Sequence, residues 1–456
     1  MVVVDSQVVP RTLFSSEPIA VTVQGFKSIA ESTTIPLGPL TVLAGVNSSG
    51  KSSILQPLLM IKQTLDTSYD PGALLLDGAN VRISRADQMF TKRPGSNRVK
   101  RSFGIEFLLS DDWAIGFTFT QPADKRRIFT EEMTFANTTK GVEPFRITEK
   151  LSAATLKRLD ATRSSQFTDH DPFKDMEHTW EVNSERCFLE PNDIVVVDEE
   201  RRLFLGSPFM SQTRRLQSIV SDAIHLPGLR GNPERSYPRT SSEGAYPGQF
   251  QDYVASIIHT WQEEKSNELL EVANYLEFLN LTWKVEAREI DDTRVEIRVG
   301  RMPHARRGGA RDLVNIADVG LGTSQILPVL VALQVASKGQ LVILEQPEIH
   351  LHPLAQRNLA RALVVAARRG VRVIVETHSS LLLRGIQIAV ADGDIDPDFV
   401  NLHWFTRDDM TGMSRVDSAS LDDYGRFGDW PSDFDDTAID TDGEFLDAVA
   451  ARLGDD

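Results

Sequence analysis

The sequence predicts an α/β fold in which a mixed or parallel sheet is flanked by helices. Two observations carry this prediction. Near residue 40, a strand pattern leads into a glycine-rich loop and then into a helical pattern. Between residues 340 and 376, two continuously apolar strand patterns alternate with helical patterns, as in a parallel sheet covered on both faces. These regions are far apart in the chain, so we expect a nucleotide-binding core that is split by a compact α+β insertion.

The other elements follow from local patterns along the chain. Residues 20–26 and 40–44 predict strands, and residues 52–64 predict a helix. Residues 79–120 are rich in strand patterns, whereas between 121 and 248 the signal weakens into short strands, turns and polar stretches. Further along, we expect helices at 249–279, 324–336 and 354–368 and strands at 282–290, 293–300, 340–345 and 371–376.

Composition places the chain among soluble globular proteins. Of its 456 residues, 41% are hydrophobic and 25% are charged. It has no apolar run long enough to cross a membrane, and its first residues lack the basic segment of a secretory signal. The single cysteine, Cys187, excludes an intramolecular disulfide framework and fits a reducing compartment. We therefore expect a cytoplasmic protein with no membrane partner.

Charge is unevenly distributed along the chain. Residues 407–456 hold 15 acidic and 4 basic residues, which gives −11 of the total of −16. Basic clusters occur near residues 92–101 and 301–311, and they could contact the phosphates of a nucleic acid or could be solvated loops. The acidic tail could likewise mimic nucleic acid or simply aid solubility.

The strongest motif is the run Gly45-Val-Asn-Ser-Ser-Gly-Lys-Ser52, which we call the glycine loop. Its backbone amides form a cradle for phosphate oxygens, and the start of the following helix adds a favourable dipole. Lys51 would reach the β and γ phosphates, and the Ser52 hydroxyl would ligate Mg²⁺. The motif predicts binding of ATP and Mg²⁺ through Asn47, Ser48, Ser49, Gly50, Lys51, Ser52 and Ser53.

Polar side chains follow the two apolar strands of the C-terminal region. The strand at 341–345 ends in Glu345, followed by Gln346 and Glu348, and the strand at 373–376 is followed by His378. Carboxyl ends of parallel strands share one edge of a sheet, beside the glycine loop. We expect Glu345 to hold Mg²⁺ through a water and His378 to contact the γ-phosphate or the attacking water.

A glycine-rich turn precedes the acidic strand. It contains Gly320, Gly322 and Ser324 and opens a predicted helix. Exposed amides at a helix start suit a second phosphate contact. Many helices begin with similar residues, so the turn gains weight only beside the other motifs.

Together, these motifs resemble ABC-type ATPase heads of the SMC, RecF and overcoming-lysogenization-defect kind. The likeness rests on the glycine loop, the run at 25–28, the Glu-Gln-Pro-Glu-Ile-His-Leu-His-Pro run at 345–353 and Glu-Thr-His-Ser at 376–379. The stretches 226–237 and 421–434 look like bacterial AAA-type ATPases that end in a short domain of unknown function and belong to anti-phage defence systems. The resemblance covers residues 20–60, 225–237, 316–380 and 421–434, and it is absent in between.

This resemblance implies a homodimer with two ATP molecules at its interface. Each ATP would lie between one chain's glycine loop and the partner's turn at 320–324. Lys27 would contribute to the nucleotide site, and Gln88 would be the family's glutamine loop and a Mg²⁺ ligand, although a plain surface glutamine explains Gln88 equally well. The expected regions are the N-terminal half of the head at 1–120, the insertion at 121–300, the C-terminal half at 301–406 and the tail at 407–456.

Two departures from the family pattern affect the expected activity. The usual Ser-x-Gly signature is Gly320-Leu-Gly322 here, with a serine only at 324. The second acid of the usual acidic pair is Gln346, so hydrolysis would rest on Gln346 orienting water or on Glu348 as base. We expect an ATPase with slow turnover in which ATP acts mainly as a dimer clamp.

Three functions remain open from the sequence. The first is a sensor or regulator subunit of a bacterial defence system against phage or mobile DNA, which controls a separate effector such as a nuclease. The second is an ATP-gated nuclease, for which Asp392, Asp394 and Asp396 could bind a metal, although 78 residues after His378 are few for such a domain. The third is a DNA-repair or maintenance clamp, which the absence of coiled-coil patterns disfavours.

Overall fold

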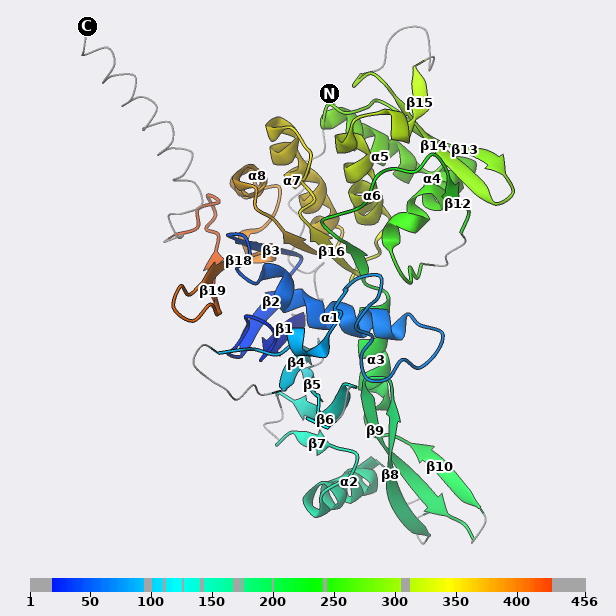
Figure 1. Cartoon of the computed structure of the whole chain (residues 1–456), viewed down its shortest axis with the longest axis vertical. Helices are drawn as coiled ribbons and strands as arrows, with labels where there is room; N and C mark the ends of the chain where they lie inside the picture. Colours follow the sequence, from blue (N-terminus) through cyan, green and yellow to red (C-terminus); the bar gives the residue numbers. More distant parts are fainter. Residues whose placement is uncertain are drawn as a thin grey trace, which may run out of the picture.

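The computed structural model confirms an α/β fold, in which the two largest sheets have six strands each (Figure 1). It describes residues 19–93, 101–109, 112–124, 127–139, 143–166, 173, 176–198, 201–240, 244–304 and 312–428. Within these ranges, no helix is both long and apolar enough to cross a membrane.

The central sheet is parallel except at one edge, as the apolar strand patterns predicted. Its strand order is β11-β16-β17-β3-β18-β19, and only β19 runs antiparallel to its neighbour. The strands are β11 (Ile224–Leu226), β16 (Leu341–Glu345), β17 (Arg372–Glu376), β3 (Leu40–Gly45), β18 (Val400–Arg407) and β19 (Ser414–Ser420). Strands from opposite ends of the chain therefore pair directly, which joins the two halves of the core.

Alternate residues of the central strands enter two different hydrophobic cores. Val42 in β3 and Val342 and Leu344 in β16 face one core, whereas Leu43 and Ile343 face the other. Because successive side chains point to opposite faces of a sheet, this alternation shows that both faces are covered. Each fully buried side chain of this size stabilises the fold by about 1.5–3 kcal/mol.

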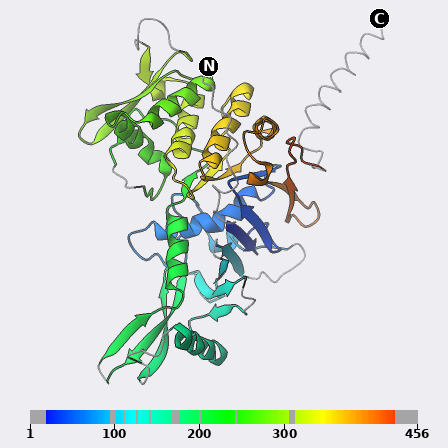
Figure 2. The ribbon, with the colours of Figure 1, turned by 180° about the vertical axis from the view of Figure 1, so that it is seen from behind.

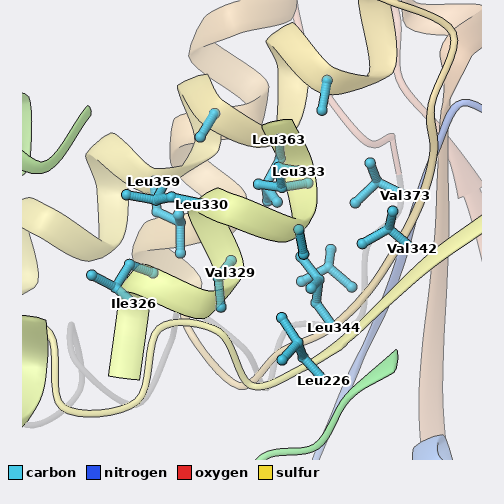
Figure 3. Close-up of a cluster of buried hydrophobic side chains, with 14 of the residues drawn as sticks. Leu226, Ile326, Val329, Leu330, Leu333, Val342, Leu344, Leu359, Leu363 and Val373 are labelled. Carbon is cyan, nitrogen blue, oxygen red and sulfur yellow. The ribbon is translucent and has the colours of Figure 1, made fainter. Parts of the chain in front are cut away.

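Helices α6 (Leu321–Val335), α7 (Pro353–Arg368) and α8 (Ser380–Ala391) contribute to the first core. Figure 3 shows Leu330 and Leu333 of α6 close to Leu359 and Leu363 of α7, beside the strands that carry Val342, Leu344 and Val373. The mostly apolar sequence of α6 is explained by its burial among α4, α5, α7 and the sheet.

Helix α1 (Lys51–Leu65) occupies the other face and lies between the central sheet and a second sheet. That antiparallel sheet has the order β2-β1-β4-β5-β6-β7. Its interior is aromatic, with Phe103 in contact with Phe26 and Phe119. Its strands are β1 (Ile19–Gln24), β2 (Thr33–Leu37), β4 (Ser102–Leu108), β5 (Trp113–Thr120), β6 (Phe129–Asn137) and β7 (Phe145–Ile147).

Residues 121–300 differ from the single insertion that the sequence suggested. Strands β6 and β7 extend the second sheet and β11 joins the central sheet, while the rest forms two separate parts. One part is a sheet of β8 (Glu177–Glu185), β9 (Phe188–Val196) and β10 (Arg202–Gly206), with α2 (Ala153–Gln166) and α3 (Met210–Ser221) nearby. Strand pairing joins residues far apart in the sequence, so local patterns do not reveal which sheet a short strand enters.

The second part lies at the opposite end of the molecule from β8–β10, as Figures 1 and 2 show. It contains helices α4 and α5 and a small sheet in which β14 pairs with β12, β13 and β15. Its elements are β12 (Tyr237–Pro238), α4 (Val254–Glu263), α5 (Asn267–Phe278), β13 (Val285–Asp291), β14 (Arg294–Gly300) and β15 (Leu313–Asn315). Short 3₁₀ turns complete the fold at η2 (Ala86–Gln88), η3 (Phe250–Tyr253), η4 (Ile316–Asp318) and η5 (Pro397–Phe399).

Residues 414–420 of the expected acidic tail form β19 of the central sheet instead, and the segment that follows them packs against α8. Leu421 is buried, and the Gln387 side-chain amide donates to the Gly425 carbonyl oxygen at 2.7 Å. Gly425 has a φ of +72°, and a Cβ there would lie 2.3 Å from the Gln387 carbonyl oxygen, so only glycine fits. The rest of the tail, from residue 429, is outside the described residues.

The basic clusters are only partly described. Arg93 pairs with Glu31, and Lys92 lies 4.0 Å from Asp87. Residues 94–100 and 305–311, which hold most of the remaining basic side chains of the two clusters, lie outside the described residues.

Candidate functional site

Three neighbouring strands bring the sequence motifs together at one edge of the central sheet. Strand β17 lies between β16 and β3, and Glu345 pairs in register with Glu376. The glycine loop follows β3 directly and leads into α1. The acidic run after β16, the residues after β17 and the loop therefore meet at one strand edge, as expected for parallel strands.

The glycine loop needs glycine at two positions for steric reasons. Gly45 has a φ of +139°, and a Cβ there would lie 2.1 Å from the Phe405 carbonyl oxygen. Gly50 has a φ of +105°, and its Cβ would lie 2.1 Å from Ser414 Oγ. Any other residue at these positions would push the loop away from β18 and β19.

Ser414, at the start of β19, fastens the glycine loop to the body. Its hydroxyl contacts the Ser28 hydroxyl at 2.8 Å and the Ser49 carbonyl oxygen. Its backbone amide donates to the Ser28 carbonyl oxygen at 2.9 Å. Ser414 thus links the glycine loop to Ser28, which precedes Ser414 by 386 residues.

Lys51 is the first residue of α1 and is almost fully buried. Its ammonium group donates to the carbonyl oxygens of Gly45 at 3.0 Å and Val46 at 2.8 Å. Burial lowers the pKa of Lys51, and the carboxylates of Glu376 and Glu348 oppose that shift. The cation thus sits inside the curve of the loop, close to two acids.

Ser52 bonds to Glu376, a residue that the predicted site did not include. The Ser52 hydroxyl donates to Glu376 Oε1 at 2.9 Å. Burial, together with the nearby Glu345, raises the pKa of Glu376 to about 7. Glu376 is 4% exposed, and its Oε2 atom has no hydrogen-bond partner.

Glu345 is held by the segment that follows β11. His225 Nε2 lies 3.2 Å from Glu345 Oε1, and the Gly228 amide donates to Oε2 at 3.2 Å. The other ring nitrogen of His225 lies 3.0 Å from Asn80 Oδ1. Burial alone would raise the pKa of Glu345, but the contacts with His225 and Gly228 and the charge of Arg230 hold it below its usual value.

Glu348 connects the acidic run to the residues after β17. Its Oε1 atom accepts from the Thr377 hydroxyl at 2.6 Å and from the His378 amide at 3.0 Å. Burial raises the pKa of Glu348. Burial lowers the pKa of the His378 imidazole, and the charge of Lys51 lowers it further, which favours a neutral ring near neutral pH.

Gln346 occupies a strained backbone position between these acids. Its φ is +44°, in the left-handed region, where a residue other than glycine costs about 1–2 kcal/mol. The backbone amide of Gln346 donates to the backbone carbonyl oxygen of Glu376 at 2.7 Å, and the backbone carbonyl oxygen of Gln346 accepts from Arg230 at 3.3 Å. Such strain is typical of functional sites, where neighbouring contacts enforce the conformation.

Arg230 supports the acidic run from the adjacent loop. Its guanidinium donates to the carbonyl oxygens of Pro227, Glu345 and Gln346 at 3.2–3.3 Å. Burial lowers the pKa of Arg230 to about 10, so it stays cationic at neutral pH. The backbone after β16 is therefore fixed by a buried positive charge.

Lys27 and Gln88 lie at the margin of this arrangement. Lys27 Nζ donates to Gln56 Oε1 on α1 at 2.6 Å, and burial lowers the pKa of Lys27. Gln88 is exposed, and its Oε1 atom accepts from the Arg85 amide at 3.3 Å, which closes the η2 turn. The structure thus gives Gln88 a local role and shows no contact between it and Ser52 or Glu345.

The turn before α6 presents its backbone rather than its serine. Gly320 and Leu321 are exposed at the helix start. Ser324 is buried, and its hydroxyl donates to the Leu321 carbonyl oxygen at 3.1 Å. A Cβ on Gly322 would lie 3.1 Å from the His350 carbonyl oxygen, so glycine keeps this turn close to the acidic run.

The residues present fit a magnesium nucleotide. Mg²⁺ prefers hard oxygen ligands, and the Ser52 hydroxyl lies beside a buried carboxylate with a free oxygen atom, Glu376 Oε2. Lys51 supplies a cation at the start of α1, where helix amides and dipole favour phosphate. Bound Mg²⁺ would neutralise the phosphate charge and polarise the bond to the terminal phosphate.

Sequence reasoning missed five side chains of this site: Asn80, His225, Arg230, Glu376 and Ser414. Arg230 lies in a stretch singled out only for its family likeness, and Asn80, His225 and Ser414 stand in no motif. His225 is 120 residues from the carboxylate that it contacts, and Ser414 is 365 residues from Ser49. Glu376 had a visible signal, because it ends an apolar strand directly before His378.

The raised pKa of Glu376 predicts a pH-dependent effect of Glu376→Gln on stability. Between pH 4.5 and about 7, the folded wild type retains a proton that its unfolded chain has released, so wild-type stability falls as pH rises. The amide variant lacks this loss and should become the more stable protein, by up to about 3 kcal/mol above pH 7. Urea unfolding of both proteins without nucleotide or metal, from pH 4.5 to 8, measures the difference. A difference in unfolding free energy that does not change with pH would contradict the raised pKa of Glu376.

Comparison with known proteins is consistent with this geometry. A family model described as "AAA domain, putative AbiEii toxin, Type IV TA system" matches residues 40–384, from the start of β3 into α8. The match includes the glycine loop and the residues after β16 and β17. No curated protein matches the chain.

Solved structures of SMC heads are similar at low identity. An SMC head bound to the C-winged helix domain of ScpA is 13% identical, with 89% of this chain and 98% of that chain covered and a TM-score of 0.47. The SMC head domain from Thermotoga maritima is 12% identical, with 88% and 98% covered and a TM-score of 0.34. An Smc head with an extended coiled coil, bound to the C-terminal domain of ScpA and derived from Pyrococcus furiosus, is 11% identical, with 89% and 96% covered and a TM-score of 0.41.

Proposed function

The chain belongs to the family of AAA domains described as putative AbiEii toxins of type IV TA systems, and on that premise we propose that it is an ATP-dependent dimer switch. The observation that carries the proposal is the position of Lys51 and Ser52 beside the carboxylates of Glu348 and Glu376. A third carboxylate, that of Glu345, lies close to Glu376. A phosphate-binding helix start next to acids at the ends of parallel strands is the arrangement that P-loop ATPases use.

In this proposal, the backbone of residues 45–50 and the side chain of Lys51 bind the phosphates of ATP. Asn47, Ser48, Ser49 and Ser53 line the same loop and helix start. Mg²⁺ is held by Ser52, and Glu345 reaches it through a water. For hydrolysis, Gln346 or Glu348 orients or activates the water, and the neutral ring of His378 contacts the terminal phosphate.

We propose that ATP joins two chains, with the turn at 320–324 of one chain against the nucleotide of the other. The start of α6 supports this contact, because Gly320 and Leu321 are exposed and no side chain caps the helix there. The internal hydrogen bond of Ser324 makes it a backbone contact.

The biological role we propose is a regulator in a bacterial defence system that acts through a separate effector, such as a nuclease. The toxin–antitoxin wording of the family description supports a role in such systems. A nuclease activity of the chain itself has less support, because among the described residues Asp392, Asp394 and Asp396 form no ligand cluster, and Asp396 instead caps the η5 turn. A clamp with long arms is also disfavoured, since no described helix exceeds the 16 residues of α7.

Calorimetric titration with ATP, in the presence and absence of Mg²⁺, tests the proposed function. We expect saturable binding of one ATP per chain, tighter with Mg²⁺, and slow release of phosphate in a separate assay. A chain that binds no nucleotide at millimolar ATP would refute the proposal. DNA cleavage by the isolated chain with Mg²⁺ or Mn²⁺, lost in Asp394→Ala, would instead favour the nuclease.

A further inference from the structure

We propose that the Glu376 carboxylate joins the Ser52 hydroxyl in holding the Mg²⁺ ion that accompanies ATP, an inference that rests on the proposed ATP-binding function. In the predicted site, Glu345 was the acid assigned to the metal. The structure places a second carboxylate closer to the serine ligand, at the end of the strand that separates Glu345 from the glycine loop.

The position of Glu376 follows from the order of the strands. Strand β17 lies directly between β16 and β3, so its last residue stands between the acidic run and the start of α1. Glu376 pairs in register with Glu345 on one side and with Leu43 on the other. From there its Oε1 atom reaches the Ser52 hydroxyl, at 2.9 Å. An oxygen ligand that bonds to another oxygen ligand is already close enough to share one ion with it.

The free oxygen atom of Glu376 supplies independent support. The side chain is buried, and Oε2 has no hydrogen-bond partner. The ammonium group of Lys51 donates to the carbonyl oxygens of Gly45 and Val46 rather than to this oxygen of Glu376. A buried carboxylate oxygen without a partner costs free energy, and a divalent cation would remove that cost.

The other two acids are less suited to direct ligation. Both oxygen atoms of Glu345 are occupied, one by His225 and the other by the Gly228 amide. Glu348 also has a free oxygen atom, but its other oxygen is bound by Thr377 and the His378 amide, with no contact to Ser52. Of these three acids, only Glu376 combines a bond to the serine ligand with a free oxygen atom.

The variant Glu376→Gln tests the proposal with little change in shape. An amide oxygen can still accept from Ser52, but the side chain loses its charge and presents an amino group in place of one oxygen. We expect the affinity of the protein–ADP complex for Mn²⁺, measured by electron paramagnetic resonance of free Mn²⁺, to fall about 10-fold or more. Binding of ADP in the presence of EDTA should be unchanged or tighter, because a negative charge near the phosphates is removed.

The matched control is Glu181→Gln, the same substitution on the exposed hairpin strand β8, which should leave both affinities unchanged. Ser52→Ala, alone and combined with Glu376→Gln, completes a double-mutant cycle, and two ligands of one ion should give a combined loss smaller than the sum. Wild-type Mn²⁺ affinity in Glu376→Gln, or fully additive losses, would overturn the inference. If the wild type binds no ADP even in EDTA, the proposed function fails instead.

Thermal unfolding of each variant without ligand shows whether it is folded. If Glu376→Gln does not fold, Glu376→Asp replaces it, because the shorter aspartate side chain withdraws its carboxylate from Ser52. The same results then support or contradict the inference.

Discussion

Replacement of Lys51 by alanine is expected to weaken ATP binding about 100-fold. Lys51 is the buried cation at the start of α1, and its ammonium group already lies inside the curve of the glycine loop. When phosphate enters, the same group can exchange two carbonyl oxygens for phosphate oxygens, and charge-assisted hydrogen bonds contribute about 1.5–3 kcal/mol each. Removal of the cation also leaves Glu348 and Glu376 uncompensated beside the phosphates, which weakens binding further.

The measurement is a titration with a fluorescent ATP analogue at fixed Mg²⁺. Lys157→Ala, the same substitution at an exposed position on α2, serves as the control and should bind as the wild type does. Circular dichroism of both variants reports whether they are folded. ATP affinity within a few-fold of wild type in a folded Lys51→Ala protein would place the nucleotide elsewhere.

Substitution of Gln346 by glutamate is expected to raise ATP turnover about 100-fold. The side chain lies beyond the end of β16, where related ATPases are expected to carry the second acid, and a positioned general base contributes about 10²–10⁴-fold. Glutamate has almost the same shape as glutamine, and the strained backbone at φ +44° is held by Glu376 and Arg230 in either case. The wild-type amide can orient a water but cannot accept its proton.

Steady-state phosphate release at pH 8, where an added carboxylate is ionised, measures this effect. Gln346→Ala is the control, since it removes the side chain without supplying a base and should not accelerate hydrolysis. ATP affinity should change little in either variant. If the wild type already turns over rapidly and Gln346→Glu slows it, ATP does not act as a clamp in the way proposed here.

Local sequence patterns predicted β3, β16 and β17, the three strands that carry the site, because these strands are buried on both faces. They did not predict β11, β18 or β19 of the same sheet. The runs that end at Glu345 and Glu376 are apolar up to the glutamate. The glycines before Lys51 adopt positive φ angles that favour glycine over other residues. The structure starts α1 at Lys51 and α7 at Pro353, each one residue before the predicted start. Burial and steric exclusion act on neighbouring residues, so they leave a signal that a single sequence can show.

Long-range contacts left no such signal. His225 holds Glu345 from a three-residue strand, and Ser414 fastens a loop that precedes it by more than 360 residues. The turn at 320–324 was expected to contact a nucleotide through its backbone amides, and the sequence did not reveal that the Ser324 hydroxyl donates to the Leu321 carbonyl oxygen within the first turn of α6. Strands β8 and β10, within residues 121–248, are largely exposed, so their sequences lack the apolar pattern from which pairing could be predicted.

The central claim, that ATP joins two chains, is tested most directly by measuring molecular mass with and without nucleotide. Sedimentation or light scattering of the wild type should give the 50.8 kDa monomer without ATP and twice that mass with Mg²⁺ and saturating ATP. Slow hydrolysis should keep the dimer intact during the measurement. A protein that is shown to bind ATP, yet forms neither a dimer nor a larger assembly at any ATP concentration, would contradict the account.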